Sequence, residues 1–386
     1  MVKKIYYLFS SITFLQFYIP ICIEAKKRGY KNIFILRQNY KKYANPLLKE
    51  NFNILDPYLH KYEIKIKIYE DINIKNIKGL VFMIDGDIYG PPRSNGPALK
   101  ESLLHKLDSN NVTKVSLTEH MQFATKYGII EPYIDYFFFE SIGVINLWNN
   151  YDSSEYSKRN LDSVTSGKGY NVYDSPKNIY NINTKFDNIN LDIEKSYYYN
   201  KFNLNKEKKY CLLLYSKFLC NNIKVINSTT NIMTYLRNLG YTIILKTRPK
   251  SKNDIPKKHI EENIYICSDS YPNETLELLQ ISDLCIFFSS SAQTECLYCE
   301  VPCISFQTSI KKIWIEHEYL AEYEKFFNFV KFNEWIDITF DNFKKILELK
   351  DEKCSTFIKD LKNKFINVKN SSERIINFFE NKKIFN

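Results

Sequence analysis

The chain has 386 residues, of which 44% are hydrophobic and 25% charged, and its formal net charge is +10. This length exceeds what one hydrophobic core usually serves and predicts two domains, while the apolar fraction and the scarcity of Gly and Pro exclude a disordered chain. The positive charge suits phosphorylated small molecules or an anionic membrane surface, but the lysines are dispersed and no zinc-finger or ribonucleoprotein motif is present, so nucleic acid is not an expected partner.

Cysteine usage and the first residues both bear on the compartment. Nine cysteines are scattered along the chain without the dense spacing of a secreted disulfide scaffold, which predicts a reducing, cytoplasmic compartment. Residues 1–28 fit a strand over 3–9 and a helix over 14–27 better than they fit a signal peptide. No window supplies the roughly 20 apolar residues that a spanning helix needs.

The first half of the chain alternates predicted strands and helices. Strands are predicted at 3–9, 32–36, 79–84, 113–117 and 134–139, and helices at 14–27, 45–50 and 98–107. Continuous apolar runs joined by helices are typical of a parallel sheet that is covered on both faces. The sequence therefore predicts a Rossmann-like domain over residues 1–150.

The pattern stops and then restarts in the second half. Polar residues dominate 151–208, which predicts a linker or a long-loop region. A second Rossmann-like domain is predicted over 209–352, followed by helices over 353–386 that could pack back on the first domain. Its strands are predicted at 210–215, 241–245, 264–267, 284–288 and 302–306, and its helices at 227–239, 275–280 and 293–299. The expected fold class is α/β, with two doubly wound domains facing a cleft and ligands at the carboxyl ends of the strands.

The most informative motif spans residues 282–306 and reads as an apolar strand, three serines, a helix and a second strand. Ser289, Ser290 and Ser291 precede the helix, where small side chains let backbone N–H groups and the helix dipole meet a phosphate. Glu295 follows about one turn later and could accept hydrogen bonds from ribose hydroxyls. The alternative is that the serines cap the helix and Glu295 is a surface carboxylate.

This motif resembles segments of two families with the GT-B fold. Ser-Ser-Ser-Ala-Gln-Thr-Glu at 289–295, with Glu300-Val-Pro302 after it, is similar to the Ser-Gly-Gly-x-Gln-Glu-Glu segment of UDP-N-acetylglucosamine 2-epimerases. It also resembles the Asp-Tyr-Ser-Ser-x-x-x-Asp segment of teichoic-acid-type glycerophosphotransferases. The resemblance implies a GT-B protein that holds a nucleotide diphosphate on these residues, Gln293 included. The glycine pair of the epimerases is absent, so the hydroxyls would have to substitute for it.

Cations of the second domain fall in matching segments. Leu245-Lys-Thr-Arg-Pro249 resembles the Lys-x-His-Pro of these families, with Arg248 in the histidine position, and Lys217 follows the first strand of this domain. The resemblance implies that Lys246, Arg248 and Lys217 contact the donor phosphates and stabilise the leaving diphosphate. A solvated surface charge is the alternative for each of them.

Catalytic candidates lie in the first domain. The segment 115–120 resembles the strand that ends in the catalytic His-Gly of the glycerophosphotransferases, which implies that His120 is the general base, although Met121 replaces the glycine. Glu119 aligns instead with the glutamate of the epimerase segment His-Val-Glu-Ala-Gly, but Leu117 then stands in the histidine position, which counts against epimerisation. A capping or packing role is the alternative for Glu119 and His120.

Two further patterns concern metals. Asp85-Gly-Asp87 is similar to the cation-binding Asp-x-Asp of GT-A enzymes, but a turn explains it equally well, and the serine loop has no place in a GT-A enzyme. We therefore expect no metal site and no cofactor; Mg²⁺ is the alternative that Asp85 and Asp87 leave open. Cys296, Cys299 and Cys303 lack a second ligand pair for zinc and are expected in the core.

The function that these features favour is a transferase of surface-glycan synthesis. It would move a sugar or polyol phosphate from a nucleotide-activated donor on the second domain to a glycan or lipid-linked acceptor on the first. It would be cytoplasmic, with peripheral contact to an anionic membrane as a further expectation. A UDP-N-acetylhexosamine 2-epimerase and a nonenzymatic relative that has kept the fold are the alternatives, because fold analogy does not decide activity.

Overall fold

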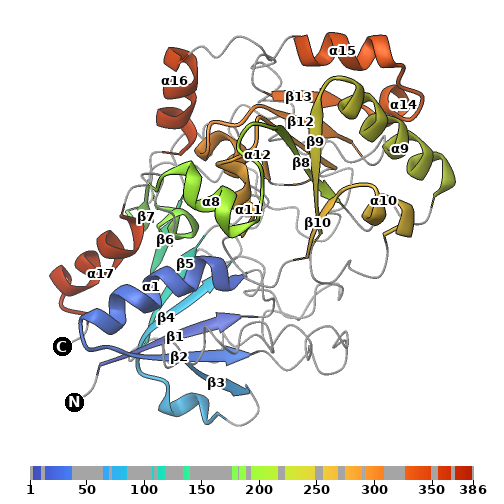
Figure 1. Ribbon diagram of the computed structural model, residues 1–386. Helices are drawn as coiled ribbons and strands as arrows, with labels where there is room; N and C mark the ends of the chain where they lie inside the picture. The colour runs from blue at the N-terminus through green and yellow to red at the C-terminus, as the bar shows by residue number, and fades with distance from the viewer. Residues whose placement is uncertain are drawn as a thin grey trace. The chain divides into compact units, whose positions relative to one another are not determined.

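The computed structural model of the protein describes residues 3–9, 14–36, 64–68, 72–84, 107, 112–117, 134–139, 176–180, 182–187, 193–215, 222–247, 255–267, 274–288, 290, 292–307, 327–348, 355–366 and 370–384. The chain divides into two units, one formed by Met1–Asn188 with Asn367–Asn386 and the other by Ile189–Ile366 (Figure 1). Each unit is built around its own parallel sheet. The helices predicted at 45–50 and 98–107 lie outside the described residues, apart from Leu107.

The sheet of the first unit contains, within the described residues, seven parallel strands in the order β3-β2-β1-β4-β5-β6-β7. The chain first builds outward from β1 to β3 and then returns to place β4 on the other side of β1. This order defines a Rossmann-like, doubly wound domain. The strands are β1 (Lys4–Phe9), β2 (Lys31–Leu36), β3 (Lys65–Ile68), β4 (Gly79–Ile84), β5 (Val112–Leu117), β6 (Tyr136–Phe138) and β7 (Asn178–Ile179).

β4 and, after Lys4, β1 are apolar runs, as expected for central strands that are buried on both faces. On one face, Tyr7 of β1 packs against α1 (Leu15–Lys27), and the ring centroids of Tyr7 and Tyr18 lie 5.4 Å apart. The Tyr18 hydroxyl donates to the Leu8 carbonyl over 2.6 Å, which satisfies the one polar atom of a buried ring. On the other face, Tyr6 belongs to a second core cluster.

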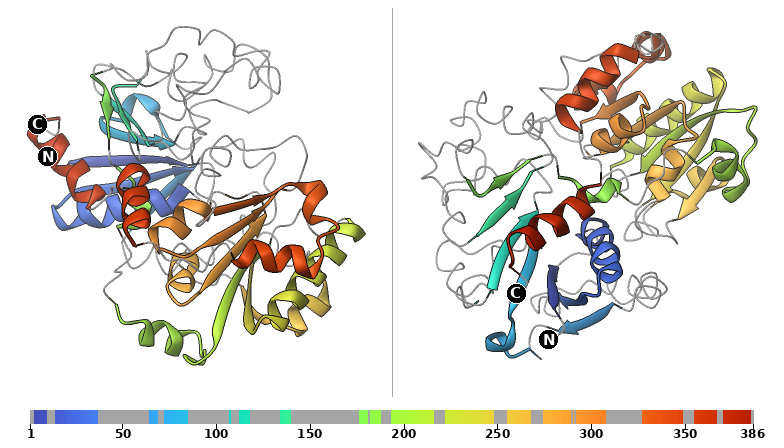
Figure 2. Two further views of the ribbon diagram at one scale, coloured as in Figure 1. Left: turned by 90° about the horizontal axis from the view of Figure 1, so that it is seen from above. Right: turned by 90° about the vertical axis from the view of Figure 1, so that its left-hand side faces the viewer.

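The last helix, α17 (Ser371–Asn381), belongs to the first unit although it is far away in sequence. Phe379 is buried and its ring lies 6.1 Å from that of Phe82, edge to face. Arg28 Nη1 forms an ion pair with Glu380 at 2.7 Å. The start of β1 and the end of α17 consequently lie close together (Figures 1 and 2).

The second unit repeats the same architecture. Its sheet contains, among the described residues, six parallel strands in the order β10-β9-β8-β11-β12-β13. These are β8 (Lys209–Tyr215), β9 (Tyr241–Thr247), β10 (Ile264–Cys267), β11 (Leu284–Phe288), β12 (Cys303–Phe306) and β13 (Phe327–Val330). The helices are α8 (Lys195–Lys201), α9 (Ile223–Asn238), α10 (Lys257–Glu261), α11 (Glu274–Leu279), α12 (Ala292–Tyr298), α14 (Phe332–Trp335), α15 (Phe340–Glu348) and α16 (Ser355–Phe365).

Helices cover both faces of this second sheet. Figure 1 shows α9, α10 and α14 on one side and α11 and α12 on the other. Tyr215, Ile243 and Phe288 contribute to the core on the α9 side, together with Trp335 of α14. The predicted α/β fold with two doubly wound domains is confirmed by the two strand orders and by helices on both faces.

The segment 151–208 differs from the predicted linker or long-loop region in its described part. It carries β7 and the 3-10 helix η9 (Thr184–Phe186) in the first unit and α8 in the second. A few apolar side chains among the polar ones account for the difference, because Phe186 and Tyr198 are buried. The helices within 353–386 divide between the units, with α16 in the second and α17 in the first.

Candidate functional site

The strand order of the second unit places a ligand-binding position at one point of its sheet. The chain runs from β8 outward through β9 to β10 and then crosses to β11 on the other side of β8. In open α/β sheets, ligands bind outside the carboxyl ends of the two strands where the order reverses. β8 ends at Tyr215, whereas β11 ends at Phe288 and is followed by Ser290 and α12. The predicted serine loop therefore begins at this switch point.

Ser290, the described residue of the serine loop, lies two residues before the first residue of α12. The Ser290 Oγ accepts a hydrogen bond from the Ala292 backbone N–H over 3.4 Å, which is the capping role weighed against phosphate binding. The hydroxyl hydrogen of Ser290 is not used in this contact and can donate to a ligand. Gln293 is buried in the first turn of α12, whereas Glu295 is partly exposed and accepts from the Thr294 hydroxyl over 3.2 Å.

A buried ion pair lies at the same carboxyl edge. Lys246, the residue before the last of β9, places its Nζ 3.0 Å from Oε2 of Glu274, the first residue of α11. Both residues are only 6% exposed. A buried ammonium group requires a partner, and a carboxylate is favourable in the first turn of a helix. The charge of Lys246, predicted for a phosphate, is therefore balanced within the protein by a residue that the motif comparison missed.

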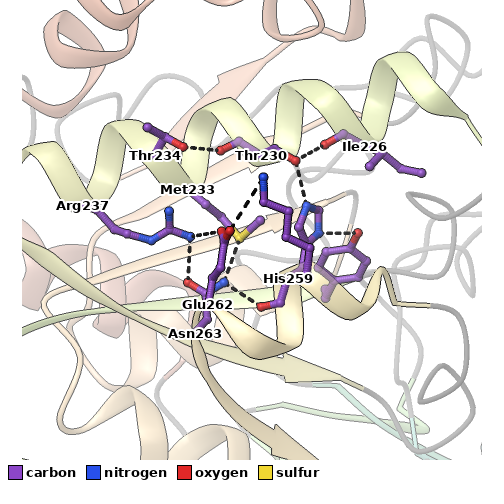
Figure 3. A network of polar contacts seen from close by, with 10 residues as sticks. Ile226, Thr230, Met233, Thr234, Arg237, His259, Glu262 and Asn263 are labelled. Atoms are coloured by element: carbon purple, nitrogen blue, oxygen red, sulfur yellow. Dashed lines mark hydrogen bonds and ion pairs between the residues drawn. The ribbon is translucent and has the colours of Figure 1, made fainter.

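A chain of hydrogen bonds holds the end of β8 (Figure 3). The Thr230 hydroxyl donates to the Ile226 carbonyl over 2.9 Å, so its oxygen accepts from His259 Nε2 over 2.7 Å. His259 therefore carries its proton on Nε2, and Nδ1 accepts from the Tyr215 hydroxyl over 3.2 Å. Every donor in this chain has one acceptor, and the chain runs from the switch-point strand to α9.

The surroundings of His259 favour its neutral form. Burial, the largest cause, lowers the pKa of His259 below its usual value of 6.5, and the charges of Lys258 and Arg237 act in the same direction. Glu262 acts in the opposite direction, but it is engaged by Arg237 at 3.2 Å. The His259 carbonyl accepts from Asn263 Nδ2 over 2.7 Å, and the Asn263 Oδ1 accepts from Arg237 of α9 over 3.4 Å, which joins this turn of chain to α9. Sequence reasoning missed His259, and its only local signal was a histidine on a short basic helix.

The structure describes some of the predicted site residues and not others. Ser290, Gln293 and Glu295 lie on or just before α12, and Lys246 lies near the carboxyl end of β9. β5 ends at the buried Leu117, so the catalytic candidates follow the carboxyl end of that strand in sequence. Outside the described residues lie Ser289, Ser291, Lys217, Arg248, Glu119, His120, Asp85 and Asp87.

Within the described ranges, no group of three or more His, Cys, Asp or Glu side chains is arranged to hold a metal ion. Cys296 and Cys303 are buried in the core and Cys299 is partly buried. Burial raises the pKa of the Cys299 thiol to about 12, so this thiol is protonated at neutral pH.

None of the helices that the structure describes combines the length and the apolarity needed to cross a bilayer.

The two sheets, their strand orders and their helical layers define a fold of the GT-B type. The chain resembles the complex of Staphylococcus aureus MnaA with UDP (TM-score 0.58, 13% identity, covering 100% of this chain and 98% of that one). It resembles the UDP-GlcNAc 2-epimerase of Methanocaldococcus jannaschii with a TM-score of 0.57 and 12% identity, covering 98% of this chain and 99% of that one. It also resembles the wall teichoic acid polymerase TagF with a TM-score of 0.56 and 12% identity, covering 99% of this chain and 88% of that one. Identities this low establish the fold alone. No family model matches the chain, and no curated protein sequence matches it either.

Proposed function

We propose that this protein is a GT-B transferase that moves a sugar or polyol phosphate from a nucleotide-activated donor to an acceptor. The observation that carries the proposal is the position of Ser290 and α12 at the switch point of the second sheet. Structures with the same fold were determined with nucleoside diphosphates, MnaA with UDP and the rhamnosyltransferase SpnG with thymidine diphosphate. A nucleotide diphosphate is therefore the expected ligand of this edge.

The proposed roles follow from the chemistry of each residue. The serine loop and the Gln293 side chain would hold the diphosphate and Glu295 the ribose hydroxyls, while Lys217 and Arg248 would supply positive charge to the leaving diphosphate. Lys246 would contribute less charge than the sequence suggested, since Glu274 balances it. No cofactor is part of the proposal.

The reaction also needs a base and an acceptor. His120 or Glu119 would take the proton from an acceptor hydroxyl, which we propose to be that of a glycan or lipid-linked molecule in surface-glycan synthesis. The scattered cysteines support a cytoplasmic location, and the positive net charge supports peripheral contact with an anionic membrane.

Thermal unfolding in the presence of nucleotides tests the donor site. UDP, CDP, GDP and dTDP are added to the full chain, to Glu295→Ala and to Glu348→Ala, a control on the exposed side of α15. A ligand at about 100 times its dissociation constant adds about 2.7 kcal/mol of stability. We expect one nucleotide to raise the Tm of the wild type and of Glu348→Ala but not of Glu295→Ala. A chain that responds to none of the four has no such site.

An epimerase is the second candidate, because solved UDP-GlcNAc 2-epimerases are among the similar structures. The buried, apolar Leu117 at the position of the epimerase histidine speaks against it, since its side chain cannot transfer a proton. Incubation with UDP-N-acetylglucosamine and no acceptor separates the two reactions. If the 2-epimer accumulates in the NMR spectrum, the transferase proposal is wrong.

A further inference from the structure

Exposed lysines gather at the amino-terminal ends of the central strands in the first unit. Lys4 of β1 and Lys31 of β2 are direct register partners. On the other side of β1, Ile5 pairs with Leu80, which brings Lys78 next to the start of β1. Neighbouring strands lie about 4.8 Å apart, so three lysines in or directly before adjacent strands line one edge of the sheet.

Two helix ends add to this edge. α1 finishes with Lys26 and Lys27, and the chain then turns directly into β2. The end of α17 is held beside this turn, because Glu380 accepts from the Tyr30 hydroxyl over 2.8 Å and pairs with Arg28. These exposed residues form what we call the basic edge: Lys3, Lys4, Lys26, Lys27, Lys31, Lys78, Lys382 and Lys383.

Few acidic side chains in the described part of the chain lie beside the basic edge. They are Glu24 and Glu380; both pair with Arg28, and Glu24 also pairs with Lys27 over 3.2 Å. Lys4, Lys31 and Lys78 form no ion pair with any described residue. Like charges on neighbouring strands are destabilising, so packing alone gives no reason for this arrangement.

Five lysines at the surface of the second unit are each paired with a glutamate, either one helical turn away or on a neighbouring element. The pairs are Lys201–Glu277, Lys257–Glu261, Lys258–Glu262, Lys344–Glu348 and Lys362–Glu300. Other lysines of this unit, such as Lys206 and Lys224, are exposed and form no ion pair with a described residue. What distinguishes the basic edge is position, because Lys4, Lys31 and Lys78 have no such pair and lie side by side at the starts of neighbouring strands.

We propose that the basic edge binds the surface of an anionic lipid bilayer. Ammonium groups are strongly hydrated point charges that respond to charge density, whereas nucleic-acid sites add aromatic rings on which bases stack. Among the described residues, the large exposed apolar side chains are Tyr197 and Ile223, and both belong to the second unit. The edge therefore offers neither stacking rings nor side chains for insertion, and it binds by electrostatic attraction alone.

The basic edge is separate from the proposed chemistry. It lies at the amino ends of the first sheet, whereas ligands of doubly wound domains bind at the carboxyl ends. Membrane contact through this edge leaves the carboxyl ends of the strands open to substrates. The basic edge thereby gives a defined surface to the peripheral membrane contact of the proposed function. Vesicle binding by this edge can be tested without a working donor site.

Co-sedimentation of the full chain with vesicles tests the proposal. The vesicles contain phosphatidylcholine alone or phosphatidylcholine mixed with phosphatidylserine. Near an anionic surface each lysine changes partitioning about fivefold, so the triple variant Lys4→Glu, Lys31→Glu, Lys78→Glu should lose at least about a hundredfold. The control triple variant Lys206→Glu, Lys224→Glu, Lys359→Glu makes the same charge change at three exposed lysines of the second unit that form no ion pair with a described residue, and it should lose far less.

Salt and nucleotide complete the test. Binding to the mixed vesicles should disappear at high salt and be absent with phosphatidylcholine alone. Both variants should keep the wild-type Tm and its shift with nucleotide, so that a failed donor site is not confused with a failed membrane contact. Equal losses in the two variants, no binding to anionic vesicles, or binding of duplex DNA in place of vesicles would each overturn the proposal.

Discussion

The polar side chains that hold the end of β8, at the carboxyl edge of the second sheet, each have a defined hydrogen-bond partner. The Tyr215 hydroxyl, the His259 ring and the Thr230 hydroxyl form one directional chain with each donor matched to an acceptor. Such networks specify a unique arrangement when complete and are destabilising when broken.

Removing the first donor of this chain should destabilise the protein measurably. Tyr215→Phe keeps the ring but leaves His259 Nδ1 buried without its donor, which costs about 1–3 kcal/mol of unfolding free energy. Tyr197→Phe, at an exposed tyrosine, is the matched control and should change nothing beyond error. Urea denaturation measures both, and a loss in Tyr215→Phe no larger than in the control would refute the assigned hydrogen bond.

The neutral state of His259 predicts how stability depends on pH. Its folded pKa is lowered below the usual value of 6.5, so the unfolded chain binds more protons in the window between the two pKa values. The His259 contribution is therefore complete above about pH 6.5 and falls as the pH drops through that window. Denaturation of wild type and His259→Gln at several pH values isolates it. The variant should show a shallower decline on the acid side, and an unchanged slope would mean that His259 does not titrate as proposed.

The ion pair at the edge of β9 should be far more sensitive than surface pairs. Glu274→Gln leaves the buried Lys246 ammonium without its carboxylate and should cost about 3–5 kcal/mol. Glu261→Gln breaks the exposed pair with Lys257 and should cost less than about 0.5 kcal/mol. Comparable effects of the two substitutions in denaturant unfolding would show that the Lys246–Glu274 pair is solvated.

At the scale of elements, α17 covers a face of the first sheet that is otherwise apolar. Phe379 is buried, and its ring lies 5.8 Å from Phe138 and 6.1 Å from Phe82. The helix is therefore part of the core of the first unit.

Truncating the Phe379 side chain should show how far the stability of the first unit depends on α17. Phe379→Ala removes a large buried ring and should cost about 3–5 kcal/mol, because the sheet cannot close the resulting cavity. Lys382→Ala, at the exposed end of the same helix, should stay within about 0.5 kcal/mol of wild type. Thermal denaturation compares them, and equal Tm values would place α17 outside the cooperative unit.

At the scale of the molecule, the chain enters and leaves the second unit once each. Residues 189–366 are contiguous, whereas the first unit joins residues 1–188 to 367–386. A single contiguous fragment can therefore contain the whole second unit but not the whole first unit.

Fragments should behave accordingly. The segment 189–366 contains a whole sheet with its own core, and we expect it to unfold cooperatively and to keep the nucleotide response. The segment 1–188 lacks α17 and should be strongly destabilised or unfolded until a peptide of residues 367–386 is added. Circular dichroism during heating measures both, and cooperative unfolding of 1–188 alone would contradict the role given to α17.

Much of the fold could be predicted because the pattern of apolar residues over a short stretch of sequence distinguishes strands from helices. The strands near 3–9, 79–84, 210–215 and 284–288 are continuous apolar runs, which is how strands buried on both faces read. The two domains and the helix after the serine loop follow from the same periodicity. Elements with few apolar residues, such as β7 and α8, gave no such signal and were missed.

What the sequence by itself determined is therefore the alternation of strand and helix, the two doubly wound domains, and a serine loop that starts a helix. Only the tertiary structure decided which side chains meet. Lys246 pairs with Glu274, Tyr215 bonds to His259, and α17 returns to β4 from the far end of the chain. The physical reason is range: secondary structure follows from neighbours a few residues apart, whereas these contacts join residues that are close only after the sheets have assembled.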